Sequence, residues 1–366
     1  MSTTTERQIK RERLLGLMAD KGLDALWLRR VSSFAWYTGG AASYVNIAAE
    51  YGPSSLLITA QQEYVIANNI EATRLRQEER LEDAGFAIEE APWHETNPWV
   101  KRLTAGQQVG TDGPLPGMVD VAGEVARLRA WLTPAEGERL RALGTLCAAA
   151  MDAAIRQVRP GMSEYEIAAR LAEETLAREA FPIVNLIATD ERIYRFRHPL
   201  PTAKRLDRYA MLVLCGRRGG LICSITRLVY FGSLPDDLRR RHAAVAQVDA
   251  VLHAYTRPGV TLGAVLAQAQ ASYAATGYAD EWQLHHQGGA TGYESREYLG
   301  LPGSSDVVRT GQAFAWNPSI TGTKSEDTIL VGQEGYEVLT ETPGWPMVEV
   351  AVQGRLCHRP AILAMA

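Results

Sequence analysis

The chain has 366 residues, of which 46% are hydrophobic and 22% charged, a length and composition typical of a globular protein with two domains. Its net charge of −4 and pI of about 6.0 provide no overall positive field, which argues against nucleic acid or an acidic membrane as a partner. No apolar run approaches the roughly 18 residues of a membrane span, and the polar N-terminus lacks a secretory signal, so we expect a cytoplasmic protein.

The first 131 residues alternate between helix and strand patterns. An apolar stripe predicts a first helix that ends near Gly22. Strands are then expected at residues 24–30, 53–60, 63–69 and 107–113, and helices at residues 71–85 and 121–131, with the segment 86–93 following the first of these helices. This alternation predicts a small α/β domain over residues 1–131.

Residues 132–366 contain a diverged internal repeat. In each copy a helix is followed by Arg-Pro-Gly and a second helix, with the tripeptides at residues 159–161 and 257–259. Capping boxes at Thr133 and Ser163 mark the starts of the first two helices. Strand-like segments follow both copies, so the sequence predicts an α+β domain of two related halves with the active site in the cleft between them.

An ordered series of motifs connects this second domain with a known family. The series is TPAEGERLR with RPGMSEYEIA, then FRHPLPT, CSITR, LHHQGGATGY, GQAFAWNPSI and KSEDTILV. In this order the motifs resemble the pita-bread family of Xaa-Pro peptidases, prolidases, methionine aminopeptidases and creatinase. The first domain resembles the N-terminal domain of the creatinase and Xaa-Pro peptidase branch. The resemblance implies a pita-bread fold for the second domain and a homodimer.

Metallopeptidases of this family hold two divalent ions with two Asp, one His and two Glu, because bridging carboxylates neutralise the ions around a bridging hydroxide. The resemblance places the first Asp position at Leu214, or at Val213 under another gap choice, and neither side chain can bind a metal. The second Asp position falls at Ser224, unless that position is deleted.

The remaining ligand positions retain one imidazole and one carboxylate. The His position falls at His286, with His285 as the alternative, and the two Glu positions fall at Asn317 and Glu326. Both Glu positions lie in FAWNPSITGTKSEDTILV (314–331), which is predicted to form two strands joined by a short turn. One imidazole and one carboxylate hold manganese or cobalt poorly, so we expect the usual two-metal Mn/Co centre to be absent and no other cofactor to be present.

The surviving polar residues favour acid–base chemistry without a metal. His198, in FRHPLPT, matches the family's substrate-facing His, which is the general acid/base in creatinase. We therefore predict that His198, His286 and Glu326 cleave a C–N bond by proton transfer near neutral pH. The run SREY (295–298) only loosely echoes creatinase, and Thr226 stands where creatinase has a Glu, so creatine is not the expected substrate.

Further residues are predicted to bind the substrate, namely His285, Arg227, Asn317, Tyr293 and Ser224. Arg227 could clamp a substrate carboxylate or pair with a buried acid. Glu326 and Asp327, with Lys324 nearby, could also form an ordinary surface turn with a weak ion pair.

Aromatic and polar residues outside these motifs are weaker candidates. Trp282 and Trp316 could pack in the core or form an aromatic wall of the cleft. Tyr37, Tyr44 and Asn46 lie in a stretch that resembles the one this branch uses for substrate or dimer contacts.

Three functions are compatible with the sequence. The first is a metal-independent hydrolase or lyase acting on a small amino-acid-like or short-peptide compound through His198 and Glu326. The second is a non-catalytic member whose cleft binds a ligand or a protein partner. The third is an Xaa-Pro dipeptidase or aminopeptidase that holds metal in an unusual way.

Overall fold

The structure, a computed structural model, describes residues 3–95 and 98–365. The chain divides into two compact units, one of residues 1–135 with 219–221 and the other of residues 136–218 with 222–366. In the part of the chain that is described, no helix is long and apolar enough to cross a membrane.

The N-terminal unit is built on one mixed sheet of six strands. Its strand order is β4-β3-β2-β1-β5-β6. The strands are β1 (Ala25–Arg30), β2 (Tyr51–Thr59), β3 (Glu63–Asn68), β4 (Ala87–Ala91), β5 (Val109–Thr111) and β6 (Val119–Asp120). The helices are α1 (Thr3–Lys21), α2 (Val31–Thr38), α3 (Ala72–Gln77), α4 (Pro98–Leu103) and α5 (Ala122–Arg129). The expected α/β domain is confirmed.

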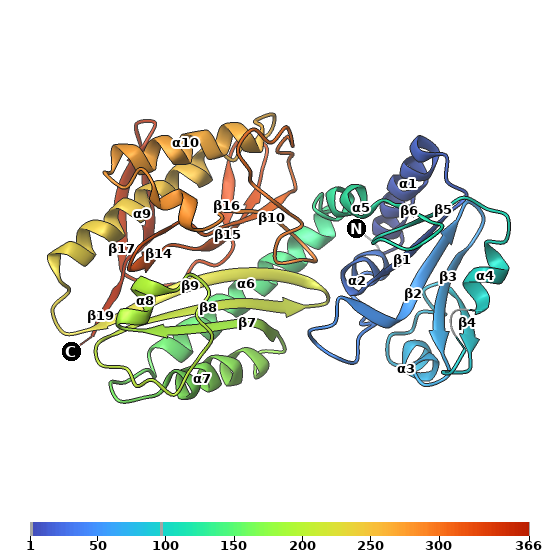
Figure 1. Ribbon diagram of the computed structural model, residues 1–366, viewed down its shortest axis with the longest axis horizontal. Helices are drawn as coiled ribbons and strands as arrows, with labels where there is room; N and C mark the ends of the chain where they lie inside the picture. Colours follow the sequence, from blue (N-terminus) through green and yellow to red (C-terminus); the bar gives the residue numbers. More distant parts are fainter. Residues whose placement is uncertain (1–2, 96–97, 366) are drawn as a thin grey trace. The chain divides into compact units, whose positions relative to one another are not determined.

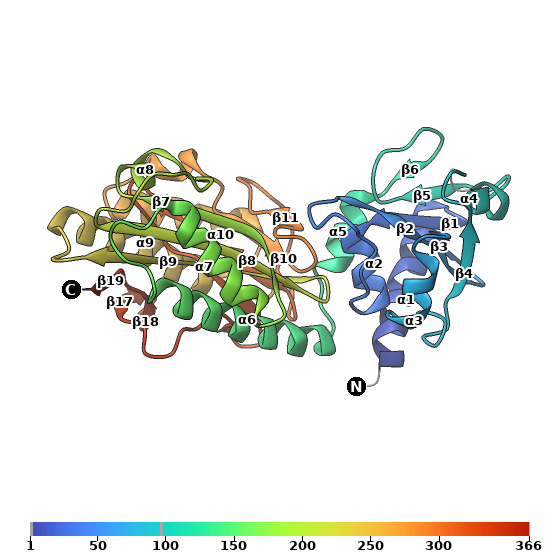
Figure 2. The same ribbon diagram turned by 90° about the horizontal axis from the view of Figure 1, so that it is seen from below.

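Both faces of this sheet are buried. Trp27 and Leu57 project to one side, where they pack with Val100 of α4. Helices α1 and α2 lie on the other side (Figure 2). Both faces are therefore covered by helices, which explains why the central strands are apolar almost throughout.

Three helices of this unit differ from the prediction. The predicted helix 71–85 ends at Gln77, and Arg80 then has a positive φ of 53°, which a helix cannot contain. Helix α2 was missed because residues 31–37 are all buried, so its sequence lacks the polar face that marks an amphipathic helix. Helix α4 was missed because six residues are too few for a periodic pattern.

The C-terminal unit contains two sheets with a pair of helices beside each (Figure 1). The helices are α6 (Pro134–Ile155), α7 (Glu164–Leu176), α8 (Glu191–Arg195), α9 (Asp236–Tyr255), α10 (Leu262–Ala275) and the 3-10 turn η1 (Glu281–Leu284). One sheet has the order β19-β9-β8-β7 and the other β11-β10-β12-β15-β16. A backbone bridge between Thr226 and Glu326 connects the two sheets.

The strands of this unit follow the repeat of the sequence. The first sheet uses β7 (Phe181–Thr189), β8 (Tyr209–Arg218), β9 (Leu221–Phe231) and β19 (Leu363–Met365). The second uses β10 (Gly288–Thr291), β11 (Tyr298–Leu299), β12 (Ala313–Trp316), β15 (Asp327–Val331) and β16 (Tyr336–Val338). Two hairpins complete the unit, β13 (Ser319–Ile320) with β14 (Thr323–Lys324), and β17 (Met347–Val352) with β18 (Arg355–Pro360).

The segment 314–331 is more elaborate than two strands and a turn. β12 and β15 pair as predicted, but the small hairpin β13–β14 lies between them. Its tight turn at Thr321-Gly322 requires glycine, since Gly322 has a φ of 94°. This hairpin sets the position of Lys324, which precedes β15.

The internal repeat is visible in the backbone. Gly161 and Gly259 both have a φ of 87°, and each donates its N–H to a carbonyl far along the chain, Leu206 and Val308 respectively. The residue that precedes the second helix also forms an antiparallel bridge in each copy, Ser163 in the first and Thr261 in the second. The two copies therefore share hydrogen bonds as well as a pattern.

The second helix of each copy allows a matched test of capping. Ser163 accepts from the Glu166 N–H and the Glu166 side chain reaches back to the Ser163 N–H, whereas Thr261 accepts from the N–H of Ala264, whose methyl side chain cannot reach back. We expect Ser163→Ala to cost about 1–2 kcal/mol and Thr261→Ala about 0.5–1 kcal/mol. Urea unfolding of both variants measures the difference, and equal losses would contradict the role of the reciprocal bond.

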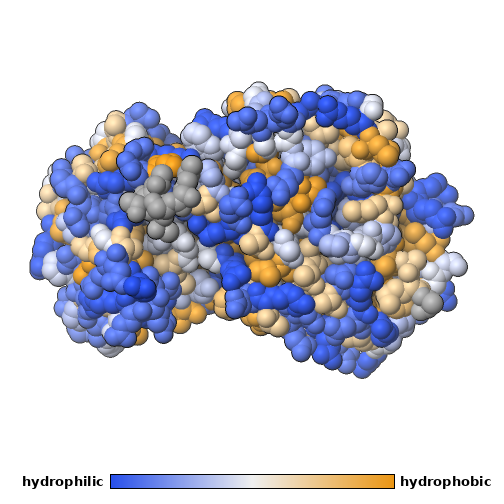
Figure 3. All heavy atoms as spheres, turned by 180° about the vertical axis from the view of Figure 1, so that it is seen from behind, coloured by the Kyte–Doolittle hydropathy of each residue, from blue (hydrophilic) through white to orange (hydrophobic). Residues whose placement is uncertain are grey.

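Surface hydropathy gives no large apolar face on the side shown in Figure 3, where hydrophobic residues form small patches among hydrophilic ones. Small scattered patches are ordinary for a folded domain.

Candidate active site

Two histidines lie in the turn between η1 and β10. His285 and His286 are separated by Gln287 alone from Gly288 and Gly289, which pack against the neighbouring strands. A Cβ atom at either glycine would lie 2.2 Å from a backbone oxygen of the adjacent strand. The expected close backbone packing is therefore present, and it holds the histidine turn in one position.

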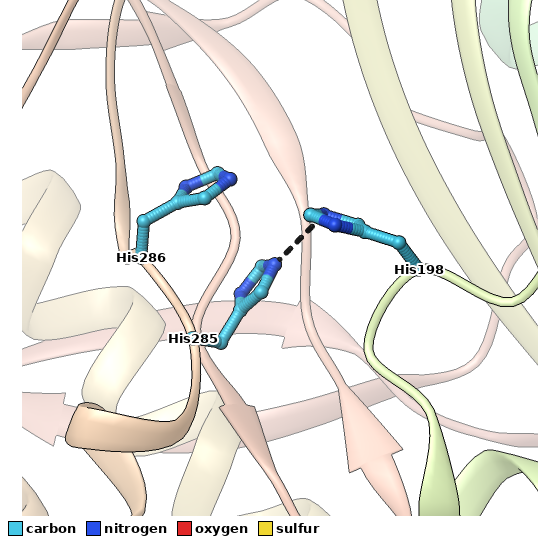
Figure 4. Close-up of side chains that lie close together, drawn as sticks. All are labelled: His198, His285 and His286. Atoms are coloured by element: carbon cyan, nitrogen blue, oxygen red, sulfur yellow. Dashed lines mark hydrogen bonds between the residues drawn. The ribbon is translucent and has the colours of Figure 1, made fainter.

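His198 enters from the loop after α8 and meets this turn (Figure 4). Its Nε2 lies 3.0 Å from Nε2 of His285, and the two rings are nearly perpendicular. His286 stacks on His285, with ring centroids 4.4 Å apart. Of the two histidines that the sequence left open, His285 is therefore the hydrogen-bond partner of His198, and His286 supports its ring.

The three imidazoles are uncharged at neutral pH. Partial desolvation of its ring, with the nearby charge of Lys324, lowers the pKa of His198 below its usual 6.5, although the residue keeps one side open to solvent. Burial and the charge of Lys324 lower the pKa of His285 to about 2. Burial and the charge of Arg296 lower the pKa of His286 to about 4. Since one neutral ring donates to the other, His198 and His285 form a connected path for one proton.

Glu326 is held by two cations. It is 2% exposed; Lys324 Nζ lies 2.8 Å from its Oε2, and Arg296 Nη2 lies 3.2 Å from its Oε1. The hydroxyl of Thr226 also donates to Oε2. Burial alone would raise the pKa of Glu326, but the charges of Lys324 and Arg296 lower it to about 2. A carboxylate with this pKa is a poor general acid or base near pH 7, contrary to the catalytic role predicted for it.

The other metal-ligand positions offer no carboxylate. Cys215 Sγ lies 3.3 Å from Ser224 Oγ, so on β8 the side chains of Cys215 and Val213 share the face that Ser224 meets, while Leu214 points the opposite way. Of the two gap choices, Val213 thus lies on the same side as Ser224. Asn317 is 3% exposed, and its Oδ1 has no hydrogen-bond partner among the described residues.

The residues do not fit two manganese or cobalt ions. Both oxygens of Glu326 are engaged by Lys324, Arg296 and Thr226, and these cations would repel a divalent ion at that position. His198, His285 and His286 offer ring nitrogens within 4.8 Å of one another. That nitrogen set suits one zinc, copper or nickel ion better than two manganese ions.

Arg227 and Asp327 belong to a buried ion network. Arg227 Nη2 lies 2.9 Å from Asp327 Oδ1 and also donates to the Thr340 carbonyl. Arg359 binds the other oxygen of Asp327, together with Asp249. The geometry favours the second alternative for Arg227, pairing with a buried acid. Lys324, Glu326 and Asp327 are all buried, so this segment is not the surface turn considered from the sequence.

Tyr293 and Trp316 form hydrogen bonds with other side chains of the same unit. The Tyr293 hydroxyl donates to Glu136 of α6, at 2.7 Å. Trp316 is fully buried and its Nε1 donates to Thr256. Trp282 is half-buried beside the histidine turn, where its carbonyl accepts from the Gln287 side chain. The Tyr293 hydroxyl is thus engaged by Glu136, and Trp316 packs in the core, the first of the two alternatives considered for it.

The three candidates in the N-terminal unit differ in burial. Tyr37 is buried and donates to Glu63 at 2.6 Å. Asn46 is exposed and accepts from the Ala48 N–H, and Tyr44 is partly buried. The first of these stabilises the unit's core.

Sequence reasoning placed Lys324 near Glu326 only as a weak surface ion pair, and it missed Arg296 as a partner of this carboxylate. Lys324 stands two residues before Glu326 in the motif KSEDTILV, and Arg296 lies in the run SREY. The sequence did contain one signal for this ion pair. Lys324 is a basic residue close to the ligand position Glu326, in a chain that lacks the other carboxylate ligands. Tertiary structure was needed to show that both reach one carboxylate.

The fold and site define a two-unit protein with a curved two-sheet domain that carries a histidine cluster. Residues 138–333 match metallopeptidase family M24, and residues 10–142 match the creatinase/prolidase N-terminal domain. The chain belongs to this family of pita-bread Xaa-Pro peptidases and creatinases.

Individual relatives are distant. The chain is 31% identical over 212 residues to an agropine synthesis cyclase of Rhizobium rhizogenes, covering 50% of this chain and 52% of that protein. It is 22% identical over 234 residues to an Xaa-Pro dipeptidase of Lactobacillus helveticus, covering 61% and 63%. The chain thus spans less than two thirds of either relative.

Solved structures agree on the fold. An Xaa-Pro dipeptidase from Bacillus anthracis has a TM-score of 0.78 at 20% identity, covering 98% of this chain and 100% of its own. The N-terminal domain of FACT complex subunit SPT16 from chickpea has a TM-score of 0.71 at 13% identity, covering 93% and 97%. At these identities the likeness concerns the fold alone.

Proposed function

We propose that this protein is a metal-independent acid–base enzyme that breaks or forms a C–N bond in a small amino-acid-like or peptide-like compound. The observation that carries the proposal is the 3.0 Å contact between Nε2 of His198 and Nε2 of His285. His198 is exposed and can meet a substrate, while His285 is almost fully buried and can receive or return the proton behind it.

The proposal gives the remaining residues supporting roles. His198 removes a proton from the attacking group and returns it to the leaving group. His285 orients the ring of His198 through their hydrogen bond, and His286 stacks behind it. Glu326 holds Lys324 and Arg296 beside the histidines and keeps its own charge.

Absence of the two-metal centre is part of the proposal. Its support is the set of residues at the ligand positions, where Val213, Ser224 and Asn317 replace three carboxylates. A further support is the occupation of Glu326 by Lys324 and Arg296. No step of the proposed reaction requires an ion.

The cyclase relative widens the reaction class. Its name describes ring closure, in which one part of a molecule attacks another. Ring closure needs the same two proton transfers as hydrolysis, one from the nucleophile and one to the leaving group. A cyclase or lyase reaction therefore suits the histidine pair as well as hydrolysis does.

The test combines metal analysis with a search for turnover. Purified protein is loaded with excess Mn²⁺, desalted and analysed for metal, then incubated with Xaa-Pro dipeptides, N-acyl amino acids and their cyclic forms, with and without EDTA. We expect less than about half an equivalent of Mn²⁺ and turnover that EDTA does not reduce. Xaa-Pro cleavage that requires Mn²⁺ would contradict the proposal. Tight binding of a compound that mass spectrometry recovers unchanged would support a non-catalytic binding protein.

The homodimer remains a proposal that rests on the family resemblance, and the cytoplasmic location one that rests on the sequence pattern of the chain.

A further inference from the structure

The histidine cluster, which consists of His198, His285 and His286, brings nitrogens from three rings together. One nitrogen of each ring lies within 4.8 Å of the other two. In Figure 4 the rings of His285 and His286 extend toward His198, which comes from the opposite side. Converging ring nitrogens are the arrangement with which three histidines hold a single metal ion.

The spacing of the closest pair suits one tetrahedral ion. Zinc binds an imidazole nitrogen at about 2.0–2.1 Å, so two such nitrogens are about 3.4 Å apart. The Nε2 atoms of His198 and His285 are 3.0 Å apart. A small outward movement of His198, which is exposed and lies on a loop, therefore admits an ion between them. The His286 ring, whose nitrogen lies in the same group, can provide a third ligand.

The ring of His286 has no other partner among the described residues. It forms no hydrogen bond there, and its Nδ1 is buried. The proton path between His198 and His285 gives this ring only a stacking contact. A metal ion supplies the missing partner, because a neutral imidazole has a free lone pair on one nitrogen.

The surroundings decide which ion the rings can hold. Glu326 is not available as a ligand, since Lys324 and Arg296 pair with it. Imidazole ligands suit zinc, copper and nickel, whereas manganese and magnesium prefer oxygen ligands. Among the described residues, Nδ1 of His285 and Nδ1 of His286 have no hydrogen-bond acceptor. Because such acceptors usually strengthen metal binding about 10–100-fold, we expect a micromolar site and not a nanomolar one.

We propose that His198, His285 and His286 together bind one zinc ion. The site differs from the two-metal centre of the family's metallopeptidases, because it uses His198 and no carboxylate. The bound ion takes the Nε2 lone pair with which His198 accepts a proton, so it inhibits the reaction. This inhibition rests on the proposed function, whereas the binding of zinc does not.

The first test measures binding of the metal alone. Full-length protein without an affinity tag is treated with EDTA, desalted and titrated with Zn²⁺ by calorimetry. We expect one equivalent to bind with a micromolar Kd. His198→Ala and His286→Ala should each weaken binding about 10-fold or more, whereas His358→Gln, a half-exposed histidine outside the cluster, should not. No measurable binding, two equivalents, or unchanged binding in His198→Ala would overturn the inference.

A second measurement reports the geometry of the bound ion. Co²⁺ is added in place of zinc, and the visible absorption spectrum is recorded. We expect the intense bands of a four-coordinate ion in the wild type and their loss in His198→Ala. Since His198 is exposed, this variant should keep the wild-type Tm without metal. A weak six-coordinate spectrum, or intense bands that persist in His198→Ala, would overturn the inference.

Turnover separates the site from the proposed function. One equivalent of Zn²⁺ should abolish turnover of a substrate that the panel identifies, and EDTA should restore it. Turnover that instead requires zinc would contradict the metal-independent function, while the three-histidine site would stand. Turnover without any zinc binding would overturn the inference alone.

Discussion

His198→Ala and His285→Ala should each lower kcat by about 10²–10⁴-fold, because each removes one end of the proton path that the 3.0 Å Nε2–Nε2 contact creates. The substrate is whichever compound the panel identifies, and the rate is followed by mass spectrometry at neutral pH. His358→Gln is the matched control, since His358 is half exposed and lies on a hairpin outside the histidine cluster. Full activity in His198→Ala would contradict acid–base catalysis at this pair.

The pH profile carries the same prediction. The active form of His198 is the neutral ring, whose pKa burial and Lys324 hold below 6.5. Activity should therefore be level around neutral pH and fall as the pH drops through this lowered pKa. The His285→Ala variant should shift the acid limb, because His285 contacts the ring that titrates. A profile that instead rises only above pH 7 would indicate a different base.

Asp327→Ala should destabilise the C-terminal unit by about 3–5 kcal/mol, because it leaves the buried Arg227 without its carboxylate and Arg359 with Asp249 alone. Urea unfolding followed by circular dichroism measures the loss. Glu173→Ala is the control, since it breaks an exposed pair with Arg170 and should change stability by less than about 0.5 kcal/mol. A loss below about 1 kcal/mol for Asp327→Ala would show that the network contributes little.

Local sequence patterns predicted much of the fold. The Arg-Pro-Gly tripeptides predicted the repeat because only glycine readily takes the positive φ that Gly161 and Gly259 both have. The Ser163 cap was predictable because its partner Glu166 is three residues away. Patterns of this kind depend only on residues that are close to each other in the sequence. Helix α2, buried on all sides, carries no such pattern and was missed.

The candidate site was only partly predictable. His198, His285 and Glu326 could be named from motifs, because each motif lies on one stretch of chain. Their partners could not be named. Arg296 pairs with Glu326, 30 residues away in the sequence, and Arg227 pairs with Asp327, 100 residues away. Such distant pairs cannot be identified from a local pattern.

The sequence by itself thus determined the family, the two-domain organisation and the loss of carboxylates at the ligand positions, since each depends on residue identity along the chain. Only the tertiary structure decided which histidine meets His198 and which ions surround Glu326. The physical reason is that the charge balance and the hydrogen bonds of a buried site depend on side chains from segments that are far apart in the sequence. The same Glu326 that the motifs mark as a free base is, in the folded protein, a carboxylate neutralised by Lys324 and Arg296.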